Sequence, residues 1–211
     1  VLNTPEMRLY YFSTPGPDGS PQVEIFPVAI GRQGWETPVT ETTLVSKHRD
    51  PAWYPPESIR REHAAEGDPL PRVVPAGPDN PLGRYALRLG IPGYLIHGTN
   101  KAFGVGMRVS HGCVRMLPED VESLFERIPV GTPVQIINQP VKVGWQAGTL
   151  YLEVHPPLEE DEVNRERLAD TVWRLVDEAV GDRFLVLKEA SILDEIRRPS
   201  GIPREISESL F

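Results

Sequence analysis

The sequence predicts an α+β protein with a mostly antiparallel β core, and three observations predict this class. Segments rich in aromatic and β-branched residues come first, and the long stretch with helical periodicity comes late. Proline supplies 23 of the 211 residues, about double its usual share of ~5%. Because proline fixes φ and removes a backbone donor, short strands and ordered loops are favoured over a helical bundle. Apolar residues make up 39% of the chain and charged residues 25%, which is typical of a globular core.

The expected strands share alternating apolar positions and comprise residues 7–12, 22–31, 40–48, 85–90, 94–99 and 132–138. The first two form a hairpin across the turn sequence TPGPDGSP. Between the third and fourth strands, residues 51–83 are interrupted by prolines and contain one short helical segment, ESIRREHAAEG. Loops of this length in compact domains are often lids or binding walls, so we expect residues 51–83 to border a functional cleft.

The remaining elements are helical, apart from a second hairpin over residues 141–156. One helix begins at Pro118, with acidic residues in its first turn and an apolar face of Val121, Leu124, Phe125 and Ile128. A longer helix is expected over 160–181, with a buried stripe of Leu168, Val172, Leu175, Val176 and Ala179. A short helix and a tail end the chain. We therefore expect two domains, a β-rich one over 1–139 and a C-terminal hairpin and helical subdomain over 140–211.

Charge excludes some partners. The formal net charge is −8 and the pI about 5.2, which argues against nucleic acid and against an anionic membrane surface. No apolar run approaches the roughly 18 residues of a membrane span. Residues 158–211 hold 14 acidic and 8 basic residues, which indicates a solvated helix face. We expect the long helix to dock on the 141–156 hairpin and the first domain; the alternative is a helix that binds a partner.

The most informative stretch is residues 97–116, HGTNKAFGVGMRVSHGCVRM, which holds the only cysteine. Attack of a thiol on an acyl carbonyl needs a base, a group that orients the base, and donors for the oxyanion. Cys113 is the candidate nucleophile and His97, at the end of an expected strand, the candidate base. The backbone N–H groups of Gly112 and Cys113 are the candidate oxyanion donors. The helix that begins near Pro118 could lower the pKa of the thiol.

Two other interpretations apply to the same residues. A lone cysteine is often an inert core residue. A zinc site of His97, His111 and Cys113 is the second alternative, but the paired ligand spacing of structural zinc is missing from the sequence. Tyr94, Phe103 and Met107 can be read as packing residues.

The complete string resembles the YkuD-type L,D-transpeptidases, whose signature is a histidine, a glycine-rich spacer and the sequence Ser/Thr-His-Gly-Cys. His97, Ser110, His111, Gly112 and Cys113 occur in that order. The resemblance covers roughly residues 3–138, and the sequences INQPVKV and YLEVHPPL resemble a periplasmic Gram-negative branch that often carries a LysM module and attaches Braun-type lipoprotein. Arg115 stands where many members have asparagine, and this puts in doubt any role carried over for the asparagine.

The resemblance implies a β-rich catalytic domain in which Cys113 attacks the third residue of a peptidoglycan tetrapeptide stem and releases D-Ala. It implies that His97 is the base and that its second ring nitrogen donates to the carbonyl of Gly98. We expect Gly98, Ser110 and His111 to be positioning residues. We expect Arg115, Tyr94 and Thr99 to contact the substrate, although a surface ion pair is an equal alternative for Arg115.

The resemblance further implies a periplasmic enzyme without metal or organic cofactor. The acceptor could be the lysine of a Braun-type lipoprotein, the diaminopimelate of another stem, or water. Transfer to water would make the protein an L,D-carboxypeptidase or a lipoprotein-releasing hydrolase. A sortase, a papain-like wall peptidase and a non-catalytic wall-binding module are the other classes. The short separation of His97 and Cys113 argues against a sortase, their order against a wall peptidase, and the presence of both against a non-catalytic module.

Overall fold

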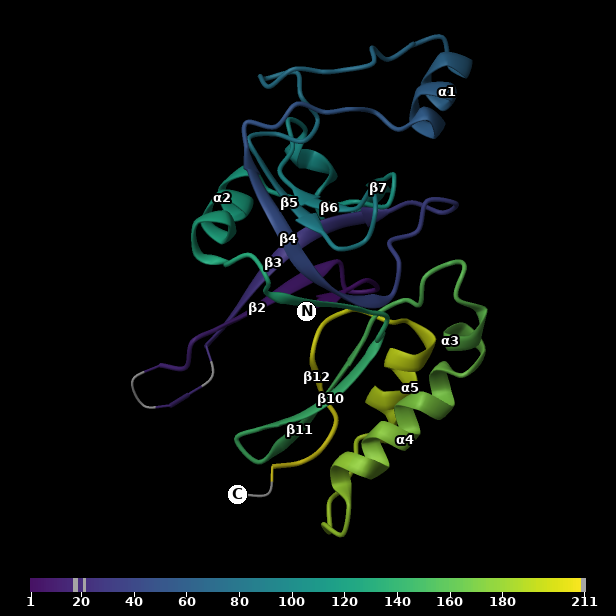
Figure 1. The fold of residues 1–211 in the computed structure, drawn as a ribbon. Helices are drawn as coiled ribbons and strands as arrows, with labels where there is room; N and C mark the ends of the chain where they lie inside the picture. The colour runs from purple at the N-terminus through teal and green to yellow at the C-terminus, as the bar shows by residue number, and fades with distance from the viewer. Residues whose placement is uncertain (17–18, 21, 210–211) are drawn as a thin grey trace. The chain divides into compact units, whose positions relative to one another are not determined.

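The structure, a computed structural model, describes residues 1–16, 19–20 and 22–209. It divides into two compact units, Val1–Ile137 and Asn138–Phe211 (Figure 1). Part of the expected turn TPGPDGSP, residues 17, 18 and 21, lies outside the described residues. None of the helices in the described residues is long and apolar enough to cross a membrane.

The first unit is built on a sheet that contains nine strands in the described residues. They are β1 (Leu2–Asn3), β2 (Arg8–Ser13), β3 (Gln22–Gly31), β4 (Thr40–Arg49), β5 (Tyr85–Leu89), β6 (Leu95–His97), β7 (Arg108–Ser110), β8 (Val114–Met116) and β9 (Pro133–Ile137). Their order is β2-β1-β9-β4-β5-β6-β8-β3-β7, and β2 also pairs with β3. The sheet therefore closes on itself like a barrel, and the predicted α+β class is confirmed.

Most pairings are antiparallel, as predicted, including the expected β2–β3 hairpin, in which Arg8 lies opposite Pro27. Three pairings are parallel: β1 with β9, β3 with β7, and β6 with β8. The sequence analysis missed β1, β7 and β8. Each of these strands has two or three residues, which is too short for an alternating pattern to be recognised.

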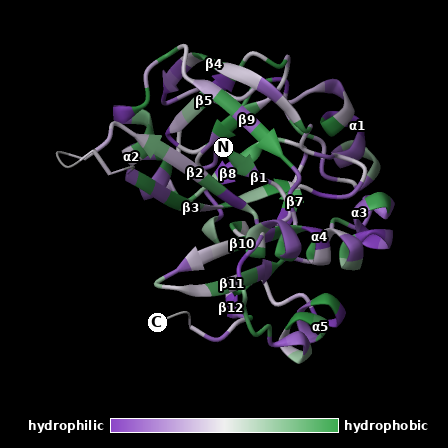
Figure 2. Ribbon diagram, turned by 90° about the horizontal axis from the view of Figure 1, so that it is seen from below, coloured by the Kyte–Doolittle hydropathy of each residue, from purple (hydrophilic) through white to green (hydrophobic). Residues whose placement is uncertain are grey.

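The core of the first unit lies on the inner faces of these strands. Its largest fully buried side chains include Ile30, Leu44, Leu87, Met116 and Ile136. Figure 2 shows these strands with apolar and polar positions mixed along their length, as expected for strands with one buried face.

Helix α2 (Pro118–Arg127) lies beside β5 and confirms the predicted amphipathic helix. Proline occupies its first turn, where the missing N–H has no helical partner. Val121, Leu124 and Phe125 are buried, and the Phe125 ring lies 4.9 Å from the ring of Tyr85 on β5. This packing fixes the polypeptide that follows the cysteine.

Residues 51–83 leave the sheet at the β4–β5 pair, where Arg49 lies opposite Tyr85, and carry α1 (Glu57–Ala65) (Figure 1). Asn80 organises the segment from a fully buried position. Its Nδ2 donates to the carbonyls of Pro51 at 2.8 Å and Pro75 at 3.1 Å, and its Oδ1 accepts from the N–H of Leu82 at 2.9 Å. The side chain of Asn80 thus satisfies backbone groups that would be bonded to other backbone groups in a regular strand or helix.

The second unit contains the strands β10 (Val141–Gln146), β11 (Thr149–Val154) and β12 (Arg204–Glu205) and the helices α3 (Glu162–Glu166), α4 (Leu168–Val180) and α5 (Glu189–Arg197). The predicted hairpin over 141–156 is confirmed as β10–β11. The predicted single helix over 160–181 is wrong: it is interrupted at Arg167, which has a ψ of 10°. Figure 1 shows α3 as a short separate helix before α4.

The apolar stripe of α4 packs against the hairpin, as predicted. Leu168, Val172 and Val176 are buried in one cluster with hairpin residues, and Leu175 and Ala179 lie at its edge. Helix α4 contacts β10. Docking of this helix on the first unit stays a prediction.

Candidate active site

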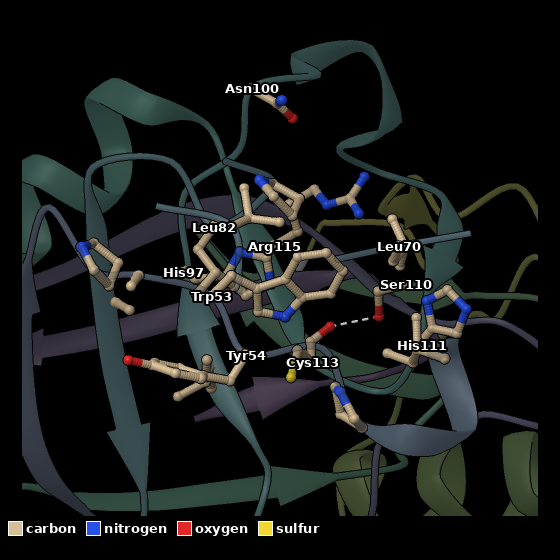
Figure 3. A pocket seen from close by; sticks show the side chains of 18 of the residues that line it. Trp53, Tyr54, Leu70, Leu82, His97, Asn100, Ser110, His111, Cys113 and Arg115 are labelled. Atoms are coloured by element: carbon tan, nitrogen blue, oxygen red, sulfur yellow. Dashed lines mark hydrogen bonds between the residues drawn. The ribbon is translucent and has the colours of Figure 1, made fainter. Parts of the chain in front are cut away.

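A cavity of about 920 Å³ in the first unit has Cys113 and His97 in its wall. Figure 3 shows these two residues and Arg115 in the same region, with Trp53 and Tyr54 beside them. The predicted role of residues 51–83 as a wall is confirmed. The lining residues from that segment include Pro51, Trp53, Tyr54, Pro56, Ile59, His63, Asp68, Leu70, Val74, Asp79 and Leu82.

A parallel strand pair brings the histidine and the cysteine together. In the register of β6 and β8, Ile96 lies opposite Val114 and His97 opposite Arg115. Because strand side chains alternate, His97 and Arg115 share one face, while Ile96 and Val114 are buried on the other. Cys113 immediately precedes β8, and the N–H of Leu95 on β6 donates to its sulfur. The spacer between His97 and Ser110 therefore serves as the crossover between two parallel strands.

The geometry of His97 suits a base. The side chain is 5% exposed, and its Nδ1 lies 2.6 Å from the carbonyl oxygen of Gly98. Since a carbonyl only accepts, Nδ1 carries the proton and Nε2 has a free lone pair. Burial, and then the charge of Arg115, lowers the pKa of His97 to about 4. The imidazole is therefore neutral at physiological pH, and the predicted contact with Gly98 is confirmed.

Burial dominates the electrostatics of Cys113. Burial raises the pKa of its thiol above the ordinary value, although the N–H of Leu95 and the charge of Arg115 act in the opposite direction. Desolvation of the thiolate therefore outweighs the favourable groups around it, and a contribution from the helix at Pro118 stays a prediction. The resting nucleophile is a thiol, whose Sγ lies 3.5 Å from the carbonyl oxygen of Gly93.

Hydrogen bonds within the motif hold the nucleophile loop. Ser110 Oγ donates to the carbonyl oxygen of Cys113 at 2.5 Å and accepts from the N–H of Gly112 at 3.1 Å (Figure 3). Thr37 Oγ1 donates to the carbonyl oxygen of Gly112 at 2.8 Å. The N–H of Gly112, one of the two expected oxyanion donors, is already bonded to Ser110, and its role as a donor stays a prediction. The N–H of Cys113 is the other candidate.

Gly112 is required for a different reason. Its φ is +98°, which disfavours any residue with a Cβ. A Cβ there would lie 3.0 Å from Cε1 of Tyr94 and 3.3 Å from the carbonyl oxygen of Glu36. Tyr94, which lines the cavity, is thus packed directly on the motif backbone.

The contacts of His111 with other side chains in the described residues are with residues other than Cys113. Its Nε2 lies 2.6 Å from Oε2 of Glu62 on α1, and its ring meets the Trp35 ring edge-on, with 4.8 Å between centroids. The sequence analysis missed Glu62, Trp35 and Thr37. Glu62 lies 49 residues before His111 in the sequence, and Thr37 lies 75 residues before Gly112. No local sequence pattern links these residues to the cysteine.

The expected substrate contacts divide into two groups. Arg115 and Tyr94 line the Cys113 cavity, and so does Lys101, which the sequence analysis missed. Nε of Arg115 is buried and has no hydrogen-bond partner among the described residues. Thr99 is not brought to this cavity: it is buried, its Oγ1 accepts from the N–H of Lys101 at 2.9 Å, and it lines a separate cavity of about 490 Å³. Its expected role as a substrate contact therefore has no support in the geometry.

Comparisons with known proteins place the chain in a family. Residues 1–136 match the family model of the YkuD L,D-transpeptidase catalytic domain. The chain is 45% identical over 209 residues to the probable L,D-transpeptidase YbiS of Escherichia coli K12, covering 96% of this chain and 66% of that protein. It is 49% identical over 168 residues to the probable L,D-transpeptidase ErfK/SrfK of Salmonella typhimurium, covering 79% of this chain and 53% of that protein.

An L,D-transpeptidase structure from Mycobacterium smegmatis is more distant, at 18% identity and a TM-score of 0.46, over 64% of this chain and 56% of that one. The chain spans about half to two thirds of the length of the curated relatives above. The match of the family model to residues 1–136 includes both His97 and Cys113. The chain belongs to the YkuD family of L,D-transpeptidase catalytic domains.

Proposed function

We propose that this chain is a peptidoglycan L,D-transpeptidase that works through a thioester on Cys113. One observation carries the proposal: a buried, neutral His97, with its Nδ1 proton held by Gly98, faces the same cavity as the single cysteine. Its free Nε2 can take a proton from a thiol that is protonated at rest. The proposed substrate is a tetrapeptide stem whose third residue is diaminopimelate, as the resemblance to the YkuD-type enzymes implies.

In the first half-reaction, Sγ of Cys113 bonds to the carbonyl carbon of the third stem residue while the thiol proton moves to Nε2 of His97. Collapse of the tetrahedral intermediate breaks the bond to D-Ala, whose nitrogen takes the proton from His97. The product is a thioester and free D-Ala. Because the thiol is neutral at rest, proton transfer to His97 accompanies the attack. The reaction therefore does not require a thiolate–imidazolium pair before the substrate binds.

Negative charge on the tetrahedral oxygen requires donors. The N–H of Cys113 is the proposed donor, since Ser110 holds the N–H of Gly112. The Arg115 guanidinium adds positive charge close enough to lower the pKa values of both His97 and Cys113. We assign the carboxylates of the stem to Arg115 and Lys101, because both cations line the cavity and Nε of Arg115 is a buried donor without a hydrogen-bond partner among the described residues. Tyr94 is the proposed apolar contact.

In the second half-reaction, an acceptor amine attacks the thioester carbon and loses a proton to His97. The carbon–sulfur bond breaks and the sulfur recovers the proton. A lysine of a Braun-type lipoprotein and the diaminopimelate of a second stem are the proposed acceptors, and water is the competing one. Since the stem lies in the cell wall, the proposed location is the periplasm.

The test uses purified protein and mass spectrometry of the intact chain. Incubation with a carbapenem or with a disaccharide-tetrapeptide should give a covalent adduct on Cys113, and the tetrapeptide should release D-Ala. Cys113→Ser should keep the melting temperature within a few degrees and form no adduct, because a hydroxyl is a much weaker nucleophile beside this base. An unmodified wild-type protein, or substantial turnover by the folded serine variant, would refute the proposal.

A further inference from the structure

One side chain of α1 reaches from the cavity wall to the nucleophile loop. Glu62 accepts a hydrogen bond from Nε2 of His111 through Oε2 at 2.6 Å, and its Oε1 pairs with the Arg32 guanidinium. His111 stands two residues before Cys113. A carboxylate on the proline-rich segment is therefore bonded to the motif that carries the nucleophile.

The protonation of this contact follows from its partners. Nε2 of His111 lies 2.6 Å from a carboxylate oxygen and 3.1 Å from a guanidinium nitrogen of Arg32. A carboxylate only accepts and a guanidinium only donates, so the ring nitrogen can satisfy one of them. The shorter contact requires the proton on Nε2, which donates to Glu62. Hydrogen bonds from His111 and then from Arg32 lower the pKa of the Glu62 carboxyl, so Glu62 is charged at neutral pH.

Besides Glu62, one α1 side chain lies against the nucleophile loop: the ring of His63 is 6.5 Å from the ring of His111. Ile59 is the buried side chain of α1. Among the described residues, Arg60 and Arg61 pair with Glu57 on the same helix, and His63 contacts Asp68 within the segment. Among the α1 side chains in the described residues, Glu62 is the one with hydrogen bonds to residues outside 51–83.

We propose that Glu62 is a positioning residue that holds α1 closed against the cavity and keeps the Ser110–Cys113 loop in place for acylation. The inference rests on the proposed function and adds a residue to it. Asn80 and the β4–β5 pair hold the two ends of residues 51–83. Loss of Glu62 should therefore release α1 without unfolding the rest of residues 51–83. The hydrogen bonds from Ser110 and Thr37 within the loop do not involve Glu62. In a Glu62 variant the Cys113 thiol is therefore still present in a folded loop.

Two different reactions of Cys113 separate this role from a general loss of structure. Acylation by a tetrapeptide or a carbapenem needs the cavity wall, whereas alkylation by iodoacetamide needs only an accessible thiol. Glu62→Ala should lower the acylation rate constant about 10- to 100-fold, since small misplacements at a reacting centre have effects of that size. Alkylation should stay equal or become faster, because α1 no longer covers the cavity.

Glu62→Gln refines the test. The glutamine keeps one oxygen for His111 but presents an amide donor to Arg32, so its acylation rate should fall between those of wild type and Glu62→Ala. Glu57→Gln is the matched control: it makes the same chemical change on the same helix and removes pairs with Arg60 and Arg61. It should acylate at the wild-type rate.

Acylation of Glu62→Ala within twofold of wild type would overturn the inference. A parallel fall of acylation and alkylation, together with a lower melting temperature, would also overturn it, because Glu62 would then be only structural. Absence of acylation in the wild-type protein would refute the proposed function, and this inference with it, and is distinct from both outcomes.

Discussion

At the scale of the residue, the site pairs two groups that are both neutral at rest. Burial raises the pKa of the Cys113 thiol and lowers that of the His97 imidazole. Desolvation penalises each charged form, so a thiolate–imidazolium pair is disfavoured before substrate binds. Arg115 lowers both pKa values, which favours the thiolate and disfavours the imidazolium. The two groups are thereby suited to a proton transfer that occurs during attack.

The two histidines of the motif should differ in mutational effect. His97→Ala removes the base and should lower the acylation rate by about 100-fold or more. His111→Ala removes a bond to Glu62 and should lower it less, by about tenfold. Stopped-flow acylation with a carbapenem measures both. A larger loss in His111→Ala would reverse the assigned roles.

The lowered pKa of His97 predicts an unusual acid limb. His97 stays neutral as the pH falls from 7 to about 5, because its pKa is about 4. Acylation should therefore be nearly constant over that range and fall about tenfold per pH unit below pH 4. A histidine with the ordinary pKa near 6.5 would lose activity from about pH 6.5 downward. A limb centred near pH 6.5 would contradict the buried, neutral histidine.

At the scale of the element, the cavity wall depends on an irregular segment with a fixed shape. Residues 51–83 have one short helix, and a buried asparagine supplies the hydrogen bonds that a regular element would form for itself. A proline-rich segment has few backbone donors of its own. The conformation of this cavity wall therefore depends on the hydrogen bonds of very few side chains.

Asn80→Ala should be correspondingly costly. It leaves the N–H of Leu82 and the carbonyls of Pro51 and Pro75 without this partner, so the free energy of unfolding should fall by about 2 kcal/mol or more. Asn100→Ala is the matched control, because Asn100 is exposed and donates a single 3.3 Å bond to Pro78. Urea unfolding curves of both variants measure the difference. Equal stabilities would show that Asn80 does not organise the segment.

At the scale of the whole molecule, each unit has its own apolar core. The second unit's cluster consists of residues from Val141 to Ile206, and the catalytic motif lies entirely within the first. A cut after residue 156, where the sequence analysis ends the hairpin, would separate β10 and β11 from the α4 stripe that packs against them. The structure divides the chain between residues 137 and 138, so a truncation there leaves each apolar core complete.

Chains 1–137 and 138–211, produced separately, should each fold. The shorter one is within the size range of small domains that fold alone. Circular dichroism should show a cooperative melting transition for both, and Cys113 in 1–137 should still be acylated by a carbapenem. A 1–137 chain that is unfolded or unreactive would show that the second unit is needed for the site.

The sequence by itself determined the candidate catalytic residues, the family resemblance and most of the longer elements. His97 and Cys113 belong to a contiguous motif whose residue types are needed for thiol catalysis, and strands such as β3 and β4 are long enough for their alternation to be read. The α4 stripe was also predictable, because helical period relates residues that are near in sequence.

Tertiary structure alone decided how those residues behave. The parallel pairing of β6 with β8, the use of the Gly112 N–H by Ser110, the raised pKa of the thiol and the contact of Glu62 with His111 were not predictable. A pKa depends on every atom that displaces water around a group, and a donor is available only if no neighbour takes it. Those neighbours come from distant parts of the chain, which the closed sheet brings together.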